Sequence, residues 1–282
     1  MSKRISVYDL NQMKAKDNKI AWLTSYDFPT AQFAQSAGME MILVGDSLGM
    51  CVYGYDGTVP VTMEQCLVHC ESVRRGAPTC FVVGDMPFGS YQSSDEQAVD
   101  NAVRFLKAAD VDAVKLEGGV RVTSRIRSIT DAGINVIGHI GLTPQSSGQL
   151  GGHKAQGRTA ETARQVVEDA LAVQKAGAVA ILVEAVPPEV TKFIWQILEI
   201  PVFSIGAGPH CDGQLLIVSD LIGQFQAFTP KFVKKYCDVA QVITDAMKTY
   251  VSEVKSGQFP DENKYCYHMV EGEEKKFKKL MA

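Results

Sequence analysis

The sequence predicts an α/β protein that folds as a single (β/α)8 TIM barrel. Seven short runs of apolar and β-branched residues recur along the 282 residues, and stretches with helical character separate them. Each run is apolar on both faces, which is typical of buried parallel strands. The series continues without an internal repeat or linker, and barrels of this kind form one unit of about 200 to 250 residues. A doubly wound parallel sheet is the alternative architecture.

The expected elements follow in order along the chain. Strands are predicted at 20–27, 40–47, 79–87, 113–118, 135–142, 178–186 and 201–208, with a weaker eighth near 224–228. Between them, Thr62 with Gln65 and Ser94 with Gln97 have the capping-box spacing that starts a helix. Two prolines introduce a further helix at 189–198, where a missing amide donor costs little. The strand rhythm ends before about residue 255, so we expect a barrel domain over 1–260 and a charged C-terminal tail over 261–282.

Composition and charge exclude several classes of function. The chain is 46% hydrophobic, and its 28 basic and 32 acidic side chains leave a net charge of -4, which argues against nucleic acid as the main partner. The apolar runs are too short to span a membrane, and the N-terminus has no apolar targeting segment. Seven cysteines without a CxxC pair fit reduced thiols better than disulfides or a zinc site. We therefore expect a cytoplasmic protein with no membrane partner.

Polar residues stand where the predicted strands end. In a (β/α)8 barrel the catalytic groups lie at the C-terminal ends of the strands, so these side chains would meet at one mouth. Stripping water from a carboxylate costs several kcal/mol, and clustered carboxylates repel one another unless a cation lies among them. The residues at these ends are Asp27, Asp46, Ser47, Asp85, Lys115, Glu117, His139, Glu184, Gly206 and Gly208.

The acidic cluster predicts a site for a hard divalent cation. Carboxylate oxygens with several water or substrate oxygens suit Mg2+. Asp46, Asp85 and Glu117 are the candidate ligands, directly or through water. Zinc is disfavoured, because no histidine pair has the spacing of zinc ligands.

Simpler structural roles stay open for several of these residues. Asp27 precedes a proline and can cap the following helix. Lys115 and Glu117, two apart on one strand face, can form a plain salt bridge. His139 can be a core histidine, and the glycines at 206–208 can form a tight turn as well as an anion-binding nest. The polar loop over 142–158 is either an active-site lid or a disordered segment without function.

Ten motifs, in one order from residue 24 to about 260, resemble the ketopantoate hydroxymethyltransferase family. LVGDSLGM at 43–50 and GHIGLTPQS at 138–146 are the most specific. The others are TSYD (24–27), VPVT (59–62), RRGAP (74–78), VKLEGG (114–119), GGHKAQGR (151–158), VEAVP (183–187), IGAGPHCDGQ (205–214) and TPKFVKKY (229–236).

The resemblance implies a barrel of the phosphoenolpyruvate/pyruvate class and a specific reaction. The enzyme would transfer a hydroxymethyl group from 5,10-methylenetetrahydrofolate to 3-methyl-2-oxobutanoate, giving 2-dehydropantoate (ketopantoate) for pantothenate and coenzyme A biosynthesis. A Mg2+-stabilised enolate would be the intermediate, and the subunits would form a cytoplasmic homodecamer. The pterin is expected near His139 and the 146–158 loop.

The family also implies a role for individual residues. Glu184 matches the proton acceptor, and the metal positions match Asp46, Asp85 and Glu117. The positions that bind or line the keto-acid site match Asp46, Ser47, Asp85, Lys115 and His139.

Two departures from the family pattern are visible. Ser219 stands where a histidine is expected in many relatives, and residues 265–282 continue past the usual end. Neither touches the metal or base positions. Two rival functions are a lyase or mutase of the same barrel class, whose KKCGH lid motif is absent here, and a catalytically silent barrel, which the presence of all four acids disfavours.

Overall fold

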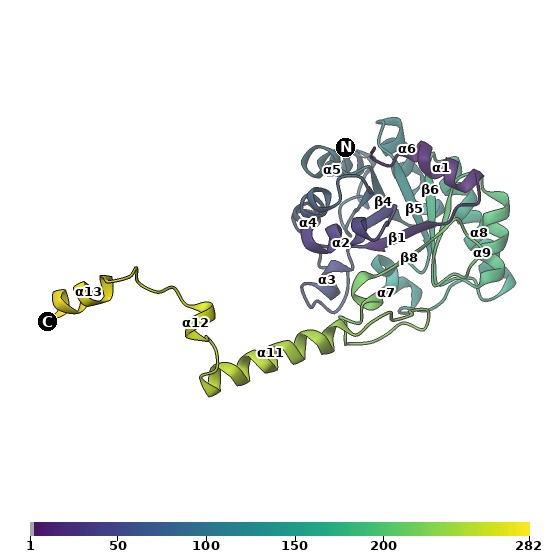
Figure 1. Ribbon diagram of the computed structural model, residues 1–282. Coiled ribbons are helices and arrows are strands. Elements are labelled where there is room, and N and C mark those ends of the chain that lie inside the picture. Colours follow the sequence, from purple (N-terminus) through teal and green to yellow (C-terminus); the bar gives the residue numbers. More distant parts are fainter. Residues whose placement is uncertain (1–2) are drawn as a thin grey trace.

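The computed structural model describes residues 3–282 and contains a closed barrel of eight parallel strands in sequential order (Figure 1). Seven strands lie inside the predicted ranges. The closed order of the strands confirms the barrel and excludes the doubly wound sheet. The strands are β1 (Ile20–Thr24), β2 (Met41–Val44), β3 (Phe81–Asp85), β4 (Ala113–Glu117), β5 (Val136–Gly141), β6 (Ala180–Glu184), β7 (Val202–Ile205) and β8 (Gly213–Leu216).

The prediction of an eighth strand near 224–228 was wrong. The strand that closes the barrel is β8, which pairs with β1 on one side and β7 on the other. A Cβ atom on Gly213 would overlap the carbonyl oxygen of Ile20, so the close approach of β8 to β1 requires glycine there. A four-residue strand that opens on glycine lacks the β-branched run by which the other strands were found.

Helices surround the barrel, and most begin at the expected signals. Thr62 forms a full capping box with Gln65. Ser94 caps its helix by accepting a hydrogen bond from the Gln97 amide, and Asp27 caps a helix in the same way. The principal outer helices are α2 (Phe28–Ser36), α4 (Met63–Gly76), α5 (Asp95–Ala109), α6 (Thr123–Asp131), α8 (Ala160–Lys175) and α9 (Pro188–Ile197).

The barrel interior is filled by apolar side chains toward its N-terminal end. The rings of Trp22 and Phe203 meet edge to face at 5.0 Å. Leu10, on α1 (Val7–Ala15), is buried in the same interior cluster. A second, larger cluster lies between the strands and the outer helices. The large interior side chains fill this part of the barrel, and the predicted site lies at the opposite, C-terminal mouth.

After the short α10 (Val218–Leu221), the segment 222–238 stays at the barrel mouth, and the chain leaves the barrel at the helix that follows. Figure 1 shows α11 (Val239–Ser256), α12 (Glu262–Tyr265) and α13 (Glu273–Met281) extending away from it. The predicted boundary at 260/261 falls between α11 and α12, and residues 1–2 of the predicted domain lie outside the described part. No helix within residues 3–282 combines the length and apolarity needed to cross a bilayer.

Candidate active site

A cavity of about 780 Å3 opens at the C-terminal mouth of the barrel. It brings together every residue that the sequence predicted for the site: Asp46, Ser47, Asp85, Lys115, Glu117, His139 and Glu184. Asp27 is not among the lining residues and serves as a helix cap instead. Gly206 lines the cavity, whereas Gly208 does not.

Strand register places the charged residues side by side. Asp85 on β3 is the register partner of Lys115 on β4, and Glu117 is the partner of His139 on β5. Lys115 and Glu117 share one strand face because they are two residues apart. Glu184, the last residue of β6, lies opposite Gly141. Asp85, Glu117 and Glu184 are each the final residue of a strand, whereas Asp46 follows the end of β2.

Lys115 lies buried among carboxylates. Its Nζ atom is 2.8 Å from Asp85 Oδ1 and 3.4 Å from Glu117 Oε1. Burial acts to lower the pKa of Lys115, but the attraction of Asp85, Glu117 and Asp46 outweighs it and raises that pKa. Burial acts to raise the pKa of Glu117, but Lys115 and His139 outweigh it and lower that pKa to about 2. The Lys115–Glu117 pair is therefore ionised at neutral pH.

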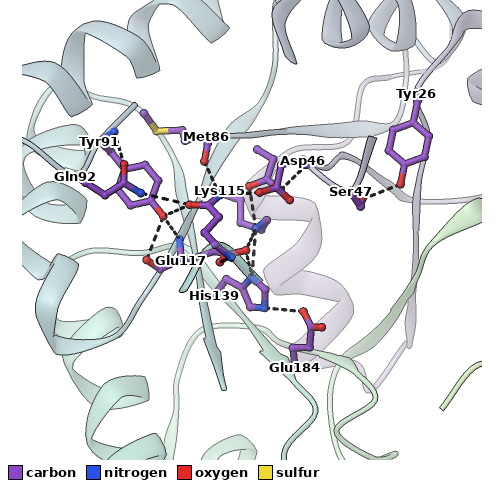
Figure 2. A network of polar contacts seen from close by, with 12 residues as sticks. Tyr26, Asp46, Ser47, Met86, Tyr91, Gln92, Lys115, Glu117, His139 and Glu184 are labelled. Atoms are coloured by element: carbon purple, nitrogen blue, oxygen red, sulfur yellow. Dashed lines mark hydrogen bonds and ion pairs between the residues drawn. The ribbon is translucent and has the colours of Figure 1, made fainter. Parts of the chain in front are cut away.

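His139 connects the charged cluster to Glu184. Its Nε2 lies 3.0 Å from Glu184 Oε2, and its Nδ1 lies 3.3 Å from Glu117 Oε1 (Figure 2). Burial and the nearby Lys115 act to lower the pKa of His139, but hydrogen bonds to Glu117 and Glu184 outweigh them and raise it to about 9. Lys115 Nζ also lies 3.2 Å from His139 Nδ1, so Nδ1 faces both the lysine and Glu117, whereas Nε2 faces Glu184. The ring fixes the orientation of the Glu184 side chain.

Asp46 and Asp85 form a buried pair of carboxylates whose negative charge the neighbouring cations do not balance. The Asp46 amide donates to Asp85 Oδ2 at 3.0 Å. Burial, followed by repulsion from Asp85 and Glu117, raises the pKa of Asp46 well above its usual range. Burial also raises the pKa of Asp85, with Lys115 opposing and Glu117 adding to the rise. One lysine does not offset the charge on this side of the site.

Gln145 and Tyr91, which were not predicted from the sequence, complete the network of hydrogen bonds. Gln145 donates its side-chain amide to Asp46 Oδ2 at 2.9 Å, and its backbone amide donates to Glu117 Oε2 at 2.9 Å. The Tyr91 hydroxyl donates to Gln145 Oε1 at 2.6 Å. Gln145 belongs to the TPQS turn after β5, where Pro144 starts a short 3-10 helix, Pro144–Ser146. Pro144, which follows a predicted strand, was the sequence signal that could have indicated this turn.

Ser47 lies at the side of the site formed by β2. Its hydroxyl shares a hydrogen bond of 2.8 Å with the hydroxyl of Tyr26. Tyr26 is buried, and burial raises its pKa well above the usual range, so it stays protonated and able to donate. Either hydroxyl can donate in this pair, and Ser47 Oγ can offer its own proton to a ligand in the cavity when Tyr26 donates.

The donor chemistry of the site fits a hard divalent cation at Asp46 and Asp85. Within residues 3–282, no three His, Cys, Asp or Glu side chains form a ready-made metal-ligand group. The predicted set of three carboxylates is not preassembled, because both oxygens of Glu117 face Lys115, His139 and the Gln145 amide. Mg2+ needs only one or two protein carboxylates when water and substrate supply the other oxygens.

The outer part of the cavity differs in composition from its floor. Phe225, Phe228, Phe232 and two prolines at 187–188 form an apolar wall. On another side, the predicted loop contains the short α7 (Ser147–Leu150), and its residues His153, Ala155 and Arg158 line the cavity. This position fits a loop over the mouth, and its function as a lid stays a prediction.

Comparisons with known proteins agree with the sequence motifs. Residues 4–262 match the family described as ketopantoate hydroxymethyltransferase. The 3-methyl-2-oxobutanoate hydroxymethyltransferase of Alkaliphilus metalliredigens is 67% identical over 280 residues, which cover 99% of this chain and 98% of that protein.

Two solved structures share the fold at low sequence identity. Phosphonopyruvate hydrolase, in a complex with oxalate and Mg++, is 12% identical with a TM-score of 0.61 over 98% of this chain and 97% of that chain. A 2,3-dimethylmalate lyase, described as a PEP mutase/isocitrate lyase superfamily member, is 16% identical with a TM-score of 0.58 over the whole of both chains. These likenesses show that the chain shares the fold of these two proteins.

Proposed function

Because this chain belongs to the ketopantoate hydroxymethyltransferase family and is an enzyme, we propose that it transfers a hydroxymethyl group from 5,10-methylenetetrahydrofolate to 3-methyl-2-oxobutanoate. The product is 2-dehydropantoate, the pathway is pantothenate and coenzyme A biosynthesis, and the intermediate is an enolate of the keto acid. One observation carries the proposal: the carboxylate of Glu184 lies 3.0 Å from His139, in the same cavity as the buried acids Asp46 and Asp85.

Bound Mg2+ would supply a Lewis acid that polarises the keto group and stabilises negative charge on the enolate oxygen. Asp46 and Asp85 are the residues that would hold it, and the keto acid would bring its own oxygens. Glu117 keeps Lys115 and His139 charged in this arrangement. Lys115 would then offset the charge of the acids and of the keto acid's carboxylate.

Glu184 acts as the general base in this proposal. Its carboxylate takes the proton from C3 of the keto acid, and the C3–H electron pair moves into the enolate. His139 orients that carboxylate through the 3.0 Å contact. Ser47 would contact the substrate's carboxylate with its free proton.

The carbon–carbon bond forms between C3 and the methylene carbon of the folate. Both bonds from that methylene carbon to the folate nitrogens break during the reaction. One water molecule is consumed, and its oxygen becomes the new hydroxyl group. The products are 2-dehydropantoate and tetrahydrofolate, so atoms and charge balance without an oxidant or reductant.

Cellular location and assembly belong to the same proposal. All seven cysteines are free thiols, which fits the reducing cytoplasm. The proposed homodecamer is supported by α11, which buries none of its residues and exposes Val242, Ile243, Met247, Tyr250, Val251 and Val254. Light scattering of the purified protein tests the assembly.

A single assay separates this function from its rivals. The protein is mixed with Mg2+, 3-methyl-2-oxobutanoate and 5,10-methylenetetrahydrofolate, and 2-dehydropantoate is measured by mass spectrometry. The proposal predicts product. Exchange of the C3 proton without product would favour a lyase or mutase, and neither exchange nor product would favour a silent barrel.

A further inference from the structure

The carboxylate of Asp46 is oriented by one hydrogen bond. Gln145 Nε2 lies 2.9 Å from Asp46 Oδ2, and within residues 3–282 it is the one donor to this carboxylate. In the same part of the chain, Asp46 Oδ1 makes neither a hydrogen bond nor an ion pair. Gln145 therefore takes one oxygen of Asp46 and leaves the other free for a cation.

The same residue also holds Glu117, through its backbone. The Gln145 amide donates to Glu117 Oε2 at 2.9 Å, while Glu117 Oε1 faces Lys115 and His139. Both oxygens of Glu117 are then occupied, whereas Asp46 keeps one. Gln145 thus makes the difference between a carboxylate that can bind a metal and one that serves as a counter-ion.

The orientation of the Gln145 side chain is set by three partners. The two ends of a side-chain amide have the same shape, but one donates and the other accepts hydrogen bonds. Nε2 faces two acceptors, Asp46 Oδ2 at 2.9 Å and the Met86 carbonyl oxygen at 3.0 Å. Oε1 faces the Tyr91 hydroxyl at 2.6 Å. An amide turned the other way would place its oxygen against two acceptors and lose both hydrogen bonds.

Tyr91 fixes this orientation because its only proton is directed to Gln145. The backbone amide of Glu117 donates to the Tyr91 hydroxyl oxygen at 3.2 Å. The hydroxyl proton then goes to Gln145 Oε1 at 2.6 Å, which is closer than the Glu117 carbonyl oxygen at 3.3 Å. A directed chain of hydrogen bonds therefore runs from the Glu117 backbone through Tyr91 and Gln145 to the Asp46 carboxylate.

Gln145 and Tyr91 act from outside the active-site cavity. Among residues 3–282, the lining of that cavity includes neither of them. Both line a separate cavity of about 480 Å3, and Glu117 lines the two cavities. Neither side chain is therefore placed to touch the substrate. Groups that orient a metal ligand without contacting the metal commonly set its affinity.

We infer that Gln145, oriented by Tyr91, is a positioning residue that makes Asp46 a ligand for Mg2+. Without the amide donor, the Asp46 carboxylate loses its one hydrogen bond and is free to rotate in its buried site. The inference rests on the proposed function, which supplies the metal, and it adds two residues that determine how tightly the metal binds.

The test measures binding by titration calorimetry with MgCl2 as the only ligand. Gln145→Met keeps the length of the side chain and removes the donor, so Mg2+ affinity is expected to fall by about 10- to 100-fold. Tyr91→Phe keeps the ring and removes the orienting hydroxyl, so a loss of about three- to tenfold is expected. Tyr55→Phe is the matched control and should bind as the wild type. It also loses one side-chain hydrogen bond, from Gln65, but Tyr55 lines neither cavity.

A double variant tests whether Tyr91 acts through Gln145. Tyr91→Phe combined with Gln145→Met is expected to bind Mg2+ as weakly as Gln145→Met alone, because the hydroxyl has no amide left to orient. Losses that add in the double variant would overturn the directed chain.

Exchange of the C3 proton of the keto acid with deuterated water separates positioning from a merely structural role. In Tyr91→Phe, the Mg2+ concentration that gives half-maximal exchange is expected to rise by the same factor as the dissociation constant, with little change in the maximal rate. A lower maximal rate with wild-type Mg2+ affinity would overturn the inference.

The outcomes distinguish the inference from the proposed function. Wild-type Mg2+ affinity in Gln145→Met and Tyr91→Phe would overturn the inference, as would an equal loss in Tyr55→Phe. If Gln145→Met does not fold, Tyr91→Phe and its control decide alone. Wild-type protein that binds Mg2+ but exchanges no C3 proton would contradict the proposed function alone, and wild-type protein that binds no Mg2+ would contradict both.

Discussion

Aspartates are buried at both ends of the barrel, but the groups that surround them differ. At the N-terminal end, Asp212 accepts hydrogen bonds from Lys14 Nζ at 3.0 Å, Trp195 Nε1 at 2.8 Å and the Val202 amide at 2.8 Å. At the C-terminal mouth, Asp46 and Asp85 lie against each other with raised pKa values. The first arrangement is electrostatically complete and stabilises the fold, whereas the second is incomplete and suits a bound cation.

The largest effect is expected for a substitution of Glu184 at the C-terminal mouth. Glu184→Gln keeps the size of the side chain and removes the base, so formation of 2-dehydropantoate is expected to fall by about 10²- to 10⁴-fold. Calorimetry with Mg2+ and the keto acid is expected to give nearly wild-type binding. A variant that turns over at the wild-type rate would remove Glu184 from the mechanism.

The next effect tests the N-terminal end. Asp212→Ala removes three hydrogen bonds, one of them the ion pair with Lys14, and leaves a largely buried ammonium group unpaired. The free energy of unfolding is expected to drop by about 3–5 kcal/mol, measured by urea denaturation. The remaining folded protein should exchange the keto-acid proton normally. Wild-type stability would show that the two ends do not differ as described.

A smaller effect of opposite sign is expected for Asp46→Asn. The ionised carboxylate is disfavoured by burial and by Asp85, so metal-free protein is expected to gain up to about 1 kcal/mol of stability. Asparagine keeps an oxygen that can accept from Gln145. Added Mg2+ is expected to raise the melting temperature of the wild type and to leave that of the variant unchanged. An equal rise in both would exclude Asp46 as a ligand.

The smallest effect concerns the backbone next to the base. Ala185 has a φ of 48°, a left-handed conformation that strains a residue with a Cβ atom, and it follows Glu184 directly. Ala185→Gly relieves the strain but gives the unfolded chain more freedom, so stability is expected to change by less than about 1 kcal/mol. A loss of several kcal/mol in thermal unfolding would show that the Ala185 side chain packs in an essential contact.

Strand-borne parts of the site could be predicted from the sequence, because strand ends converge in a barrel. Asp85, Lys115, Glu117 and Glu184 lie in strands whose apolar runs fix their position. The orientation of Glu117 could not be predicted, since it depends on His139 across the strand pair. The Glu117 carboxylate faces His139 and Lys115 and is therefore not free to bind a metal.

Loop-borne parts escaped prediction for a physical reason. Gln145 reaches Asp46 across 99 positions of sequence, and no local pattern encodes such a contact. The segment 224–228 was expected to be a strand because it is apolar, whereas its phenylalanines line the cavity. Apolar residues at a binding wall and in a buried strand look alike in sequence.

We propose that the acidic site at the C-terminal mouth converts the keto acid to its enolate. The most direct test is proton NMR of 3-methyl-2-oxobutanoate in deuterated water with the wild-type protein and Mg2+, in the absence of folate. We expect the C3 proton signal to disappear with the wild-type enzyme and to persist with Glu184→Gln. Persistence of that signal with the wild-type enzyme, under conditions where the keto acid is bound, would contradict it.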